Sequence, residues 1–337
     1  MKRMFLLFLV LCLCLAACAA PVQKTADGTL EVHYVDVGQA DCIFLTCDGQ
    51  TMLIDGGNVD DSDVVVSYLL EQDVTKLDYV VCTHAHEDHV GGLPAVLAVF
   101  EAEQIWSPVT EYDSNCFEDF AYYADQQYKE LVCPEPGSTY SIGQAKITVL
   151  GPVQEYEDTN NTSIVLKLEH GENTFLFTAD AETEAEHDIL DFGTDISADV
   201  LKVGHHGSST STSYRWLREV APEYAVIPVG QNNSYGHPHD EVMSRLHDAD
   251  VTIYRTDLQG HIVCVSDGQE LTFTTRENVA PDTSGEAEAE YFIGNTKSKK
   301  LHLPTCAGLP GANNSTVFFS YNLAILAGYE PCGSCMR

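Results

Sequence analysis

The chain has 337 residues, and its 17 Lys plus Arg against 51 Asp plus Glu give a formal net charge of −34. Hydrophobic residues make up 44% of it and charged residues 20%, a composition that can bury a core and excludes disorder of the chain as a whole. Such an acidic surface repels phosphate backbones and anionic lipid, which argues against a broad, sequence-independent grip on nucleic acid. The last 47 residues differ, because Lys297, Lys299, Lys300 and Arg337 outnumber Glu330 there.

The first 18 residues have the layout of a secretory signal. Lys2 and Arg3 precede an apolar run and then small residues, and the run is too short for a membrane-spanning helix. Residues 15–18, Leu-Ala-Ala-Cys, match the bacterial lipobox, in which the cysteine is diacylated; a chance cysteine in an apolar leader is the alternative. We expect a lipoprotein signal at 1–18 and lipidation at Cys18, which predicts a protein on the extracellular face of the cell membrane, held by a lipid anchor only.

From residue 27 to residue 275, short β-branched runs alternate with amphipathic segments. The runs predict strands at 30–37, 41–47, 51–55, 77–83, 145–151, 163–180 (a hairpin turning at Gly171), 199–204, 224–230, 251–255, 261–266 and 269–275. Helical spacing predicts helices at 63–72, 93–103, 181–192, 211–220 and 238–249. Hairpins and crossovers are mixed, so we expect an α/β fold with helices outside two mixed sheets. Residues 276–290 are polar and acidic, which predicts a linker.

The cysteines after the leader allow two interpretations. In an exported protein some could pair, and Cys116 and Cys133 flank one segment as a disulfide staple would. Cys42, Cys82 and Cys264 lie inside apolar strand-like runs. We expect these three to be buried as small hydrophobic side chains.

The strongest chemical signal directly follows the predicted strand at 77–83. Four potential metal ligands occur within six residues there: His84, His86, Asp88 and His89. So many polar groups at a strand end cannot form a satisfied apolar core. His84 and His86 can reach one ion and Asp88 and His89 a second, and imidazole with carboxylate suits zinc, manganese or iron.

This segment resembles the metallo-β-lactamase signature, His-x-His-x-Asp-His. Further motifs make the chain similar to the metallo-β-lactamase-like domain of the ComEC competence proteins over about 30–275: VHYVDVGQADCIFL (32–45), MLIDGG (52–57), NNTSIVLKL (160–168), TAD (178–180), DVLKVGHHGSSTSTS (199–213), VIPVGQNNSYGHPH (226–239) and YRTDLQGHI (254–262). The resemblance implies an αββα metallo-β-lactamase sandwich of two mixed sheets over 27–275. It also implies two divalent metals, zinc or manganese, and hydrolysis of a phosphodiester.

The resemblance also implies roles for residues outside the histidine segment. Asp55 would support the histidine loop without binding metal, and Asp180 would bridge the two ions. His206 would be a further ligand, with His205 facing the substrate phosphate, although the two could exchange roles. Asp88, His205 and His237 are the expected catalytic residues, and His205 or His237 could protonate the leaving group.

Three points of the carried-over site stay open. His237 or His239 could complete the second metal site. Many relatives place another histidine ligand before the bridging Asp, and the one candidate here, His170, sits at a hairpin turn and is expected to be solvated; Asn160, Asn161 and Ser163 occupy that region. The Ser/Thr run at 208–212 either binds an anion at a helix start or is a plain cap.

Residues 291–337 form a second module with its own ligand pattern. His302-x3-Cys306 is followed by Cys332-x2-Cys335, which predicts a structural zinc site of the Cys3His type; disulfides are the alternative. The segment resembles the metal-binding domain of Ada DNA-repair proteins. Where that family has its methyl-accepting cysteine this chain has His302, so the resemblance implies zinc binding without alkyl transfer, and a basic edge that could meet DNA.

Together these features predict an exported, lipid-anchored, binuclear metal-dependent phosphodiesterase, with DNA as the expected substrate in a weak and cation-dependent interaction. Two bound dications would offset part of the negative charge where a phosphate must sit. The alternatives are a phosphodiesterase acting on a small molecule such as a phosphorylcholine ester, and a non-catalytic lipoprotein that captures DNA through its zinc module.

Overall fold

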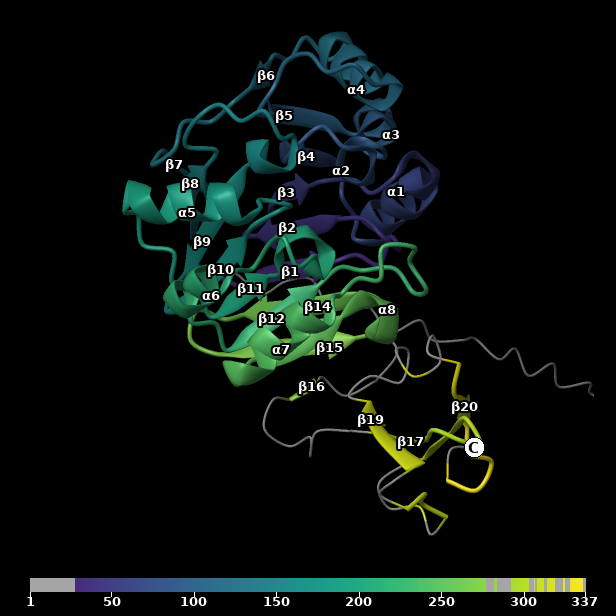
Figure 1. The fold of residues 1–337 in the computed structure, drawn as a ribbon. Helices are drawn as coiled ribbons and strands as arrows, with labels where there is room; N and C mark the ends of the chain where they lie inside the picture. The colour runs from purple at the N-terminus through teal and green to yellow at the C-terminus, as the bar shows by residue number, and fades with distance from the viewer. Residues whose placement is uncertain are drawn as a thin grey trace, which may run out of the picture.

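The computed structural model describes residues 28–276, 282–283, 292–302, 306, 308–311, 314–318, 324 and 328–335. The predicted signal segment, its Cys18 and most of the predicted linker lie outside these residues. Two eight-stranded sheets pack face to face, with helices on both outer sides, in four layers (Figure 1). The predicted α/β sandwich of two mixed sheets is therefore confirmed.

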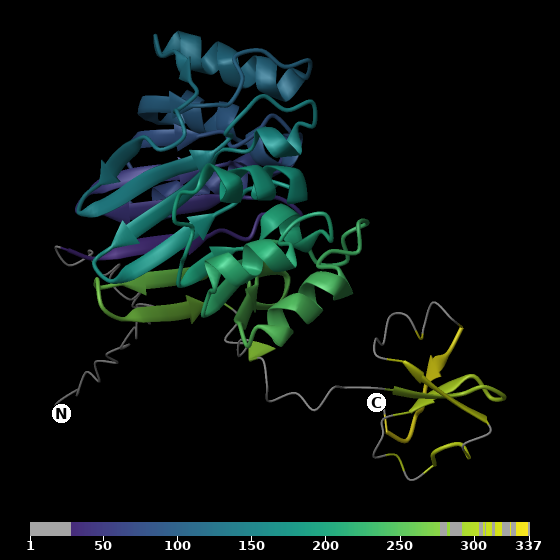
Figure 2. The same cartoon turned by 60° about the vertical axis from the view of Figure 1, so that its left-hand side comes forward.

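The first sheet joins the start of the fold to its end. Its order is β15-β14-β1-β2-β3-β4-β5-β6, so the green β14 and β15 lie beside the purple β1 (Figure 2). The strands are β1 (Leu30–Tyr34), β2 (Ile43–Cys47), β3 (Gln50–Ile54), β4 (Lys76–Val81), β5 (Glu101–Trp106), β6 (Leu131–Val132), β14 (Ile262–Ser266) and β15 (Leu271–Thr275). The pairs from β3 to β6 are parallel and the others antiparallel.

The second sheet has the order β16-β13-β12-β11-β10-β9-β8-β7. Its strands are β7 (Thr139–Ile142), β8 (Ala145–Gly151), β9 (Val165–His170), β10 (Asn173–Phe177), β11 (Val200–Lys202), β12 (Tyr224–Ile227), β13 (Thr252–Arg255) and β16 (Asp282–Thr283). Strands β10 to β13 are parallel, so their carboxyl ends share one edge. Strand β16 lies within the predicted linker and pairs with β13, so that linker is not wholly unstructured.

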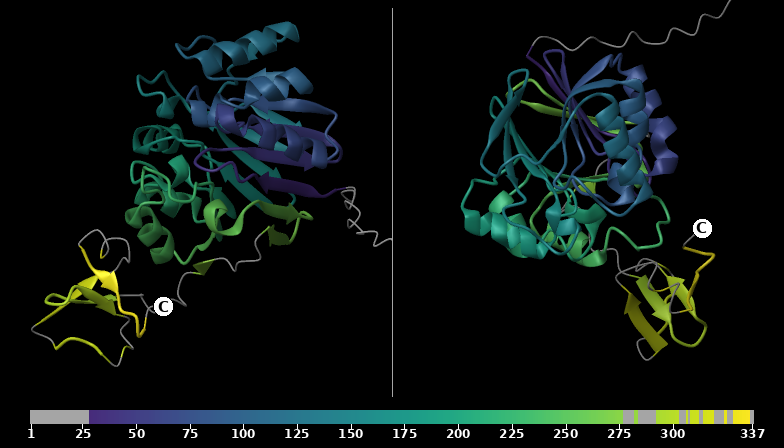
Figure 3. Two further views of the ribbon diagram at one scale, coloured as in Figure 1. Left: turned by 90° about the vertical axis from the view of Figure 1, so that its right-hand side faces the viewer. Right: turned by 90° about the horizontal axis from the view of Figure 1, so that it is seen from above.

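The core follows from the side-chain alternation of strands. In β1, Leu30, Val32 and Tyr34 point between the sheets, where they meet side chains such as Phe175 of the second sheet. The opposite faces pack under helices. Helices α1 (Ser62–Glu71), α3 (Leu93–Val99) and α4 (Asn115–Gln126) cover the first sheet, and α5 (Thr183–Phe192), α6 (Tyr214–Val220) and α7 (Asp240–Asp248) cover the second (Figure 3).

The helix predictions differ from the structure at two places. The helix predicted at 93–103 ends at Val99, because Phe100 is extended and the chain continues into β5, whose Ala102 and Ile105 are buried. Helix α4 was not predicted, although Ser114 caps it and Phe117 and Phe120 are buried along one face. Within the described residues, no helix combines the length and the hydropathy that a membrane-spanning helix requires.

The short elements sit in the loops that build the site. They are η1 (Val59–Asp61), α2 (Glu87–Val90), η2 (Asn160–Thr162), η3 (Gly204–Gly207) and α8 (Thr256–Gln259). The C-terminal strands form a four-stranded sheet of their own, in the order β19-β17-β18-β20. They are β17 (Phe292–Asn295), β18 (Lys300–His302), β19 (Ser315–Phe318) and β20 (Glu330–Pro331).

Candidate metal centre

The predicted site residues come together at the carboxyl ends of β4, β10 and β11, the edge at which α/β sheets bind ligands. The histidine loop after β4 is held against the turn after β3, where the Gly56 N–H donates to the His89 carbonyl at 2.7 Å. A Cβ on Gly92 would lie 2.1 Å from the Gly56 oxygen. The two backbones can therefore approach this closely only because residue 92 is glycine.

Asp55 lies beneath this loop and is fully buried. Its carboxylate accepts hydrogen bonds from the Thr83 N–H at 2.8 Å, the Thr83 hydroxyl at 2.7 Å and His89 Nδ1 at 2.8 Å. Because Nδ1 of His89 donates to a carboxylate, Nε2 is the ring nitrogen that can bind a metal after losing its proton. Asp55 thus occupies the supporting position that the sequence comparison implied for it.

Four side chains form a compact cluster, with ligand atoms all within 4.8 Å of one another: Asp88, His89, Asp180 and His206. Asp180 Oδ2 lies 3.4 Å from His89 Nε2 and 3.6 Å from His206 Nε2. His206 Nδ1 donates to the Pro228 carbonyl at 3.0 Å, so its Nε2 is likewise the nitrogen that can bind a metal after losing its proton.

Several buried polar atoms of this cluster have no hydrogen-bond partner: Nε2 of His89, Nε2 of His206 and Oδ1 of Asp180. Burying such atoms without partners is costly. Imidazole nitrogens and carboxylate oxygens that converge in this way are the donor set of a divalent metal. The residues therefore fit the cation that the sequence pattern predicted.

His84 and His86 form a pair beside this cluster. His84 Nε2 lies 3.2 Å from His86 Nδ1, and the His84 and His89 rings have centroids 4.0 Å apart. Burial, followed by the charge of His89, holds the pKa of His84 well below its usual value. A neutral imidazole is the form that binds metal, so this pair suits an ion adjacent to the first cluster.

The cluster balances its carboxylates with protonated histidine. Burial would lower the pKa of His206, but Asp180 and Asp41 outweigh it and raise the pKa to about 10. Burial would likewise lower the pKa of His89, but Asp180 and Asp55 outweigh this effect and raise the pKa. A bound dication supplies the same compensation, so metal binding should release protons here.

Sequence reasoning missed two residues below the cluster, Asp41 and Lys202. Both are fully buried, and their side chains form an ion pair. Lys202 Nζ also donates to the Ala179 carbonyl at 2.8 Å and lies 3.6 Å from Asp180 Oδ1. Asp41 lies 3.3 Å from His206 Nδ1. The available signal was a lysine inside the apolar run that forms β11.

His205 and His237 line the same pocket, of about 370 Å³, as the cluster. His205 Nδ1 lies 3.3 Å from the Glu182 carboxylate, and its Nε2 lies 3.5 Å from Asp180 Oδ2. Burial, then His239 and His205, lower the pKa of His237 to about 4. Asn160 also lines this pocket, and its buried Oδ1 has no hydrogen-bond partner.

Two other histidines, His239 and His170, form hydrogen bonds outside the metal cluster. His239 Nδ1 accepts from the Ser209 N–H at 2.9 Å, and its Nε2 lies 3.3 Å from the Tyr235 carbonyl, so it joins two loops. His170 is 4% exposed and hydrogen bonds to Ser266 at 2.8 Å. The prediction that His170 is solvated is therefore wrong, because β14 reaches across to cover the hairpin turn.

The Ser/Thr run at 208–212 forms a loop before α6 and not an open anion site, and the next residue, Ser213, caps the helix. Every backbone N–H from Ser208 to Ser213 has a partner within the protein. Two of these N–H groups, those of Thr212 and Ser213, donate to the buried carboxylate of Glu186 at 2.5 and 3.0 Å. Glu186 of α5 therefore fixes the loop that carries His205 and His206.

The stability contributed by Glu186 should depend on pH. Burial, partly offset by its hydrogen bonds, raises the pKa of Glu186 to about 7, whereas an unfolded chain has about 4.3. The folded state therefore binds the extra proton between these values, and its stability falls as pH rises. Relative to Glu186→Gln, the wild type should lose roughly 2–6 °C of Tm between pH 5 and pH 8. Calorimetry measures this, with exposed Glu118→Gln as control; parallel pH profiles for wild type and Glu186→Gln would contradict it.

The structure shows whether several of the cysteines are buried thiols or form disulfides. Cys42, Cys82 and Cys264 are buried, as predicted for small hydrophobic side chains. Cys116 is buried and Cys133 exposed, and both carry free thiols. The disulfide staple considered for that segment is therefore not formed.

The C-terminal module gathers its four predicted ligands. The ligand atoms of His302, Cys306, Cys332 and Cys335 lie within 4.8 Å of one another, and His302 Nδ1 is 3.3 Å from Cys306 Sγ. Three sulfurs and one imidazole are the donor set of structural zinc. The basic edge is partly engaged, since Lys300 pairs with Glu330 at 2.7 Å and Lys299 stacks over Tyr329.

Removing one of these thiols should remove one metal ion. We expect about three metals per chain, two in the pocket and one in the C-terminal cluster, and about two in Cys332→Ser. Elemental analysis of the purified protein measures this directly. Cys133→Ser, an exposed cysteine outside the clusters, is the matched control. About two metal ions per chain in the wild type, the same number as in Cys332→Ser, would show that the C-terminal cluster holds no ion.

Comparison with known proteins agrees with this geometry. Residues 35–231 match the family described as "Metallo-beta-lactamase superfamily". The chain is 29% identical over 278 residues to "ComE operon protein 3" of Bacillus subtilis (strain 168), covering 77% of this chain and 34% of that protein. It is 29% identical over 244 residues to "Competence protein ComA" of Neisseria gonorrhoeae, covering 71% and 32%. It thus spans about a third of the length of these relatives.

A solved structure shows the same fold. The metallo-beta-lactamase fold protein YhfI from Bacillus subtilis has a TM-score of 0.50 at 15% identity, and the match covers 71% of this chain and 100% of that chain. The sandwich, the cluster of imidazole and carboxylate ligands and the family match agree. This chain belongs to the metallo-beta-lactamase superfamily.

Proposed function

We propose that the protein is a divalent-metal-dependent phosphodiesterase and that DNA is its substrate. The observation that carries the hydrolase assignment is the convergence, in one cluster, of nitrogen and oxygen atoms of His89, Asp180 and His206 that have no hydrogen-bond partner. The choice of DNA is supported by the competence-protein relatives.

The residues divide the work within the pocket. Asp88, His89, Asp180 and His206 would hold one ion, and His84 and His86 would hold another together with Asp180. When bound, such a pair of ions activates water near neutral pH and neutralises charge on phosphoryl oxygens. The chain's own contribution begins with Asp55, Asp41 and Lys202, which orient the ligands by hydrogen bonds and charge.

Other residues that line the pocket, beside the ligands, would bind the substrate. His205, with its Nδ1 beside Glu182, keeps an Nε2 that can exchange a proton with a reacting oxygen. His237 and Tyr235 line the same wall. These side chains would bind and orient the phosphate while its bond to the leaving oxygen breaks.

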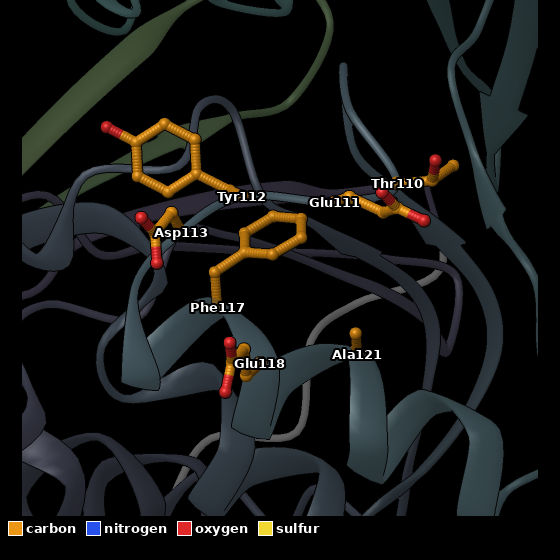
Figure 4. Close-up of a pocket in the computed structure, with 7 residues that line it drawn as sticks. All are labelled: Thr110, Glu111, Tyr112, Asp113, Phe117, Glu118 and Ala121. Atoms are coloured by element: carbon orange, nitrogen blue, oxygen red, sulfur yellow. The ribbon is translucent and has the colours of Figure 1, made fainter.

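A second pocket favours an alternative substrate, a small phosphodiester with a cationic group. This cavity, of about 580 Å³, is lined by the rings of Tyr112 and Phe117 and by three carboxylates, those of Glu111, Asp113 and Glu118 (Figure 4). The Tyr112 hydroxyl is 3.5 Å from that of Thr159, the neighbour of Asn160 in the metal pocket. Aromatic faces and carboxylates attract quaternary ammonium groups and repel polyanions.

Hydrolysis assays separate these substrates. The metal-loaded protein would be tested with single-stranded DNA, double-stranded DNA, a choline phosphodiester and bis-p-nitrophenyl phosphate, each in Mn²⁺ or Zn²⁺. We expect hydrolysis of DNA that EDTA abolishes; preference for the choline ester would support the alternative. A fully loaded protein that cleaves none of them would refute the phosphodiesterase. DNA binding without cleavage, lost on removal of residues 291–337, would instead support capture by the C-terminal module.

We also propose that the protein is exported and lipid-anchored through Cys18. The lipobox in the sequence supports this. Metabolic labelling with an alkyne fatty acid should mark the wild type, while Cys18→Ala should be unlabelled and leave the membrane fraction. Labelling of Cys18→Ala equal to that of the wild type would contradict the anchor.

A further inference from the structure

Gln39, in the loop after β1, reaches His237 across the rim of the metal pocket. Both residues line that pocket, although they are far apart in the sequence. The two loops are tightly packed, since a Cβ on Gly230 would lie 2.6 Å from the backbone nitrogen of Gln39. The relative position of the two side chains is therefore set by backbone packing.

The orientation of the Gln39 amide follows from a backbone contact. Its Oε1 lies 3.0 Å from the N–H of Gly230, a group that can only donate, so this end must be the oxygen. Its NH2 end then lies 3.3 Å from His237 Nδ1. An amide NH2 can only donate, so Nδ1 of His237 accepts and carries no proton.

This arrangement is the reverse of the one at the neighbouring histidines. Nδ1 of His89 donates to Asp55, and Nδ1 of His206 donates to the Pro228 carbonyl, which leaves each Nε2 as the nitrogen that can bind a metal after losing its proton. At His237 the lone pair is taken up by Gln39, so the proton is on Nε2.

The His237 ring is also held in place by its own loop. The Asn233 amide binds both backbone groups of residue 237, accepting from its N–H at 3.0 Å and donating to its carbonyl at 2.6 Å. The Tyr235 ring stacks on the imidazole with centroids 5.6 Å apart. The ring therefore has little freedom to turn its other nitrogen toward Gln39.

We propose that Gln39 is a positioning residue that fixes His237 as the Nε2–H tautomer, so that His237 offers the pocket a hydrogen-bond donor and is not a metal ligand. This inference rests on the proposed function for the nature of its partner, an anionic phosphoryl oxygen. A fixed donor aimed at an oxygen that gains charge stabilises the transition state. It also removes His237 as a candidate ligand of the second metal. The other candidate, His239, already uses both ring nitrogens in contacts with backbone groups.

Nitrogen-15 NMR of histidine-labelled, metal-loaded protein tests the tautomer directly. His237, assigned by its absence in His237→Asn, should show a protonated Nε2 and an unprotonated Nδ1. In Gln39→Glu the carboxylate still accepts from Gly230 but also accepts from His237, so Nδ1 should become protonated. A protonated Nδ1 in the wild type, or an unchanged Nδ1 in Gln39→Glu, would overturn the proposal.

Metal content gives an independent readout. His237→Asn should retain the metal content of the wild type, whereas loss of one ion per chain would make His237 a ligand and refute the inference. These two measurements need no activity, so they separate this inference from the proposed function. If the wild type cleaved no phosphodiester, the function would fail while the tautomer result stood.

Kinetics then test whether the donor is used. Gln39→Met and His237→Asn should each lower kcat by roughly tenfold with little change in KM. The double variant should lose little more than either single variant, because both changes remove one interaction. Gln126→Met, at an exposed position on α4, is the matched control and should match the wild type. Losses that multiply in the double variant would overturn the coupling of Gln39 to His237.

Discussion

Replacing Asp180 by asparagine should abolish hydrolysis while leaving the protein folded. Asp180 lies within 3.6 Å of both His89 Nε2 and His206 Nε2, so its loss removes the carboxylate between the expected metal positions. Because mutation of residues that only support metal ligands costs about 10–100-fold in activity, loss of Asp180 should cost more than about 100-fold. Steady-state kinetics and elemental analysis should show the two losses together.

The control is Asp125→Asn, which makes the same change at an exposed position on α4. Circular dichroism should show that both variants keep the wild-type fold. Full activity in a metal-loaded Asp180→Asn protein would exclude Asp180 as the bridging ligand.

The largest loss of stability is expected for Lys202→Met. This variant leaves two buried carboxylates, those of Asp41 and Asp180, without the cation between them. Breaking a buried ion pair by removing one partner typically costs about 3–5 kcal/mol of unfolding free energy. Urea denaturation measures the loss, and the second substitution Asp41→Asn should restore part of it.

Lys146→Met is the matched control, because Lys146 forms an exposed pair with Glu169. Exposed ion pairs contribute little to stability, so this variant should stay close to the wild type. If Lys202→Met were equally close, the buried lysine would not be compensating the carboxylates below the metal site.

Much of the site could be predicted because its ligands cluster in short motifs. The segments around His84, Asp180 and His206 each follow a strand, and the structure brings all three together at one edge. Asp41 and Lys202 escaped prediction because each looks like an isolated charge in an apolar run. Their relation appears only in the folded protein, where Asp41, in the loop between β1 and β2 of the first sheet, pairs with Lys202 of β11 in the second sheet.

The secondary structure could be predicted where the spacing of hydrophobic residues was clearly helical or strand-like. It could not be predicted where this spacing changed within a few residues. The segment 93–103 starts with helical spacing, but from Glu101 the chain forms strand β5 between β4 and β6. The burial of His170 could not be predicted from neighbouring residues, because its hydrogen-bond partner Ser266 lies on a strand 96 residues further along the chain. Long-range pairing decides such positions.

The pairing of β1 with β14 joins residue 30 to residue 266. During synthesis, β1 and β2 therefore emerge long before the strand that covers the free edge of β1. Until then that edge offers unpaired N–H and C=O groups, which in general invite pairing with other chains. We expect this protein to fold slowly and late, and chains truncated before residue 262 to aggregate instead of forming a smaller stable domain.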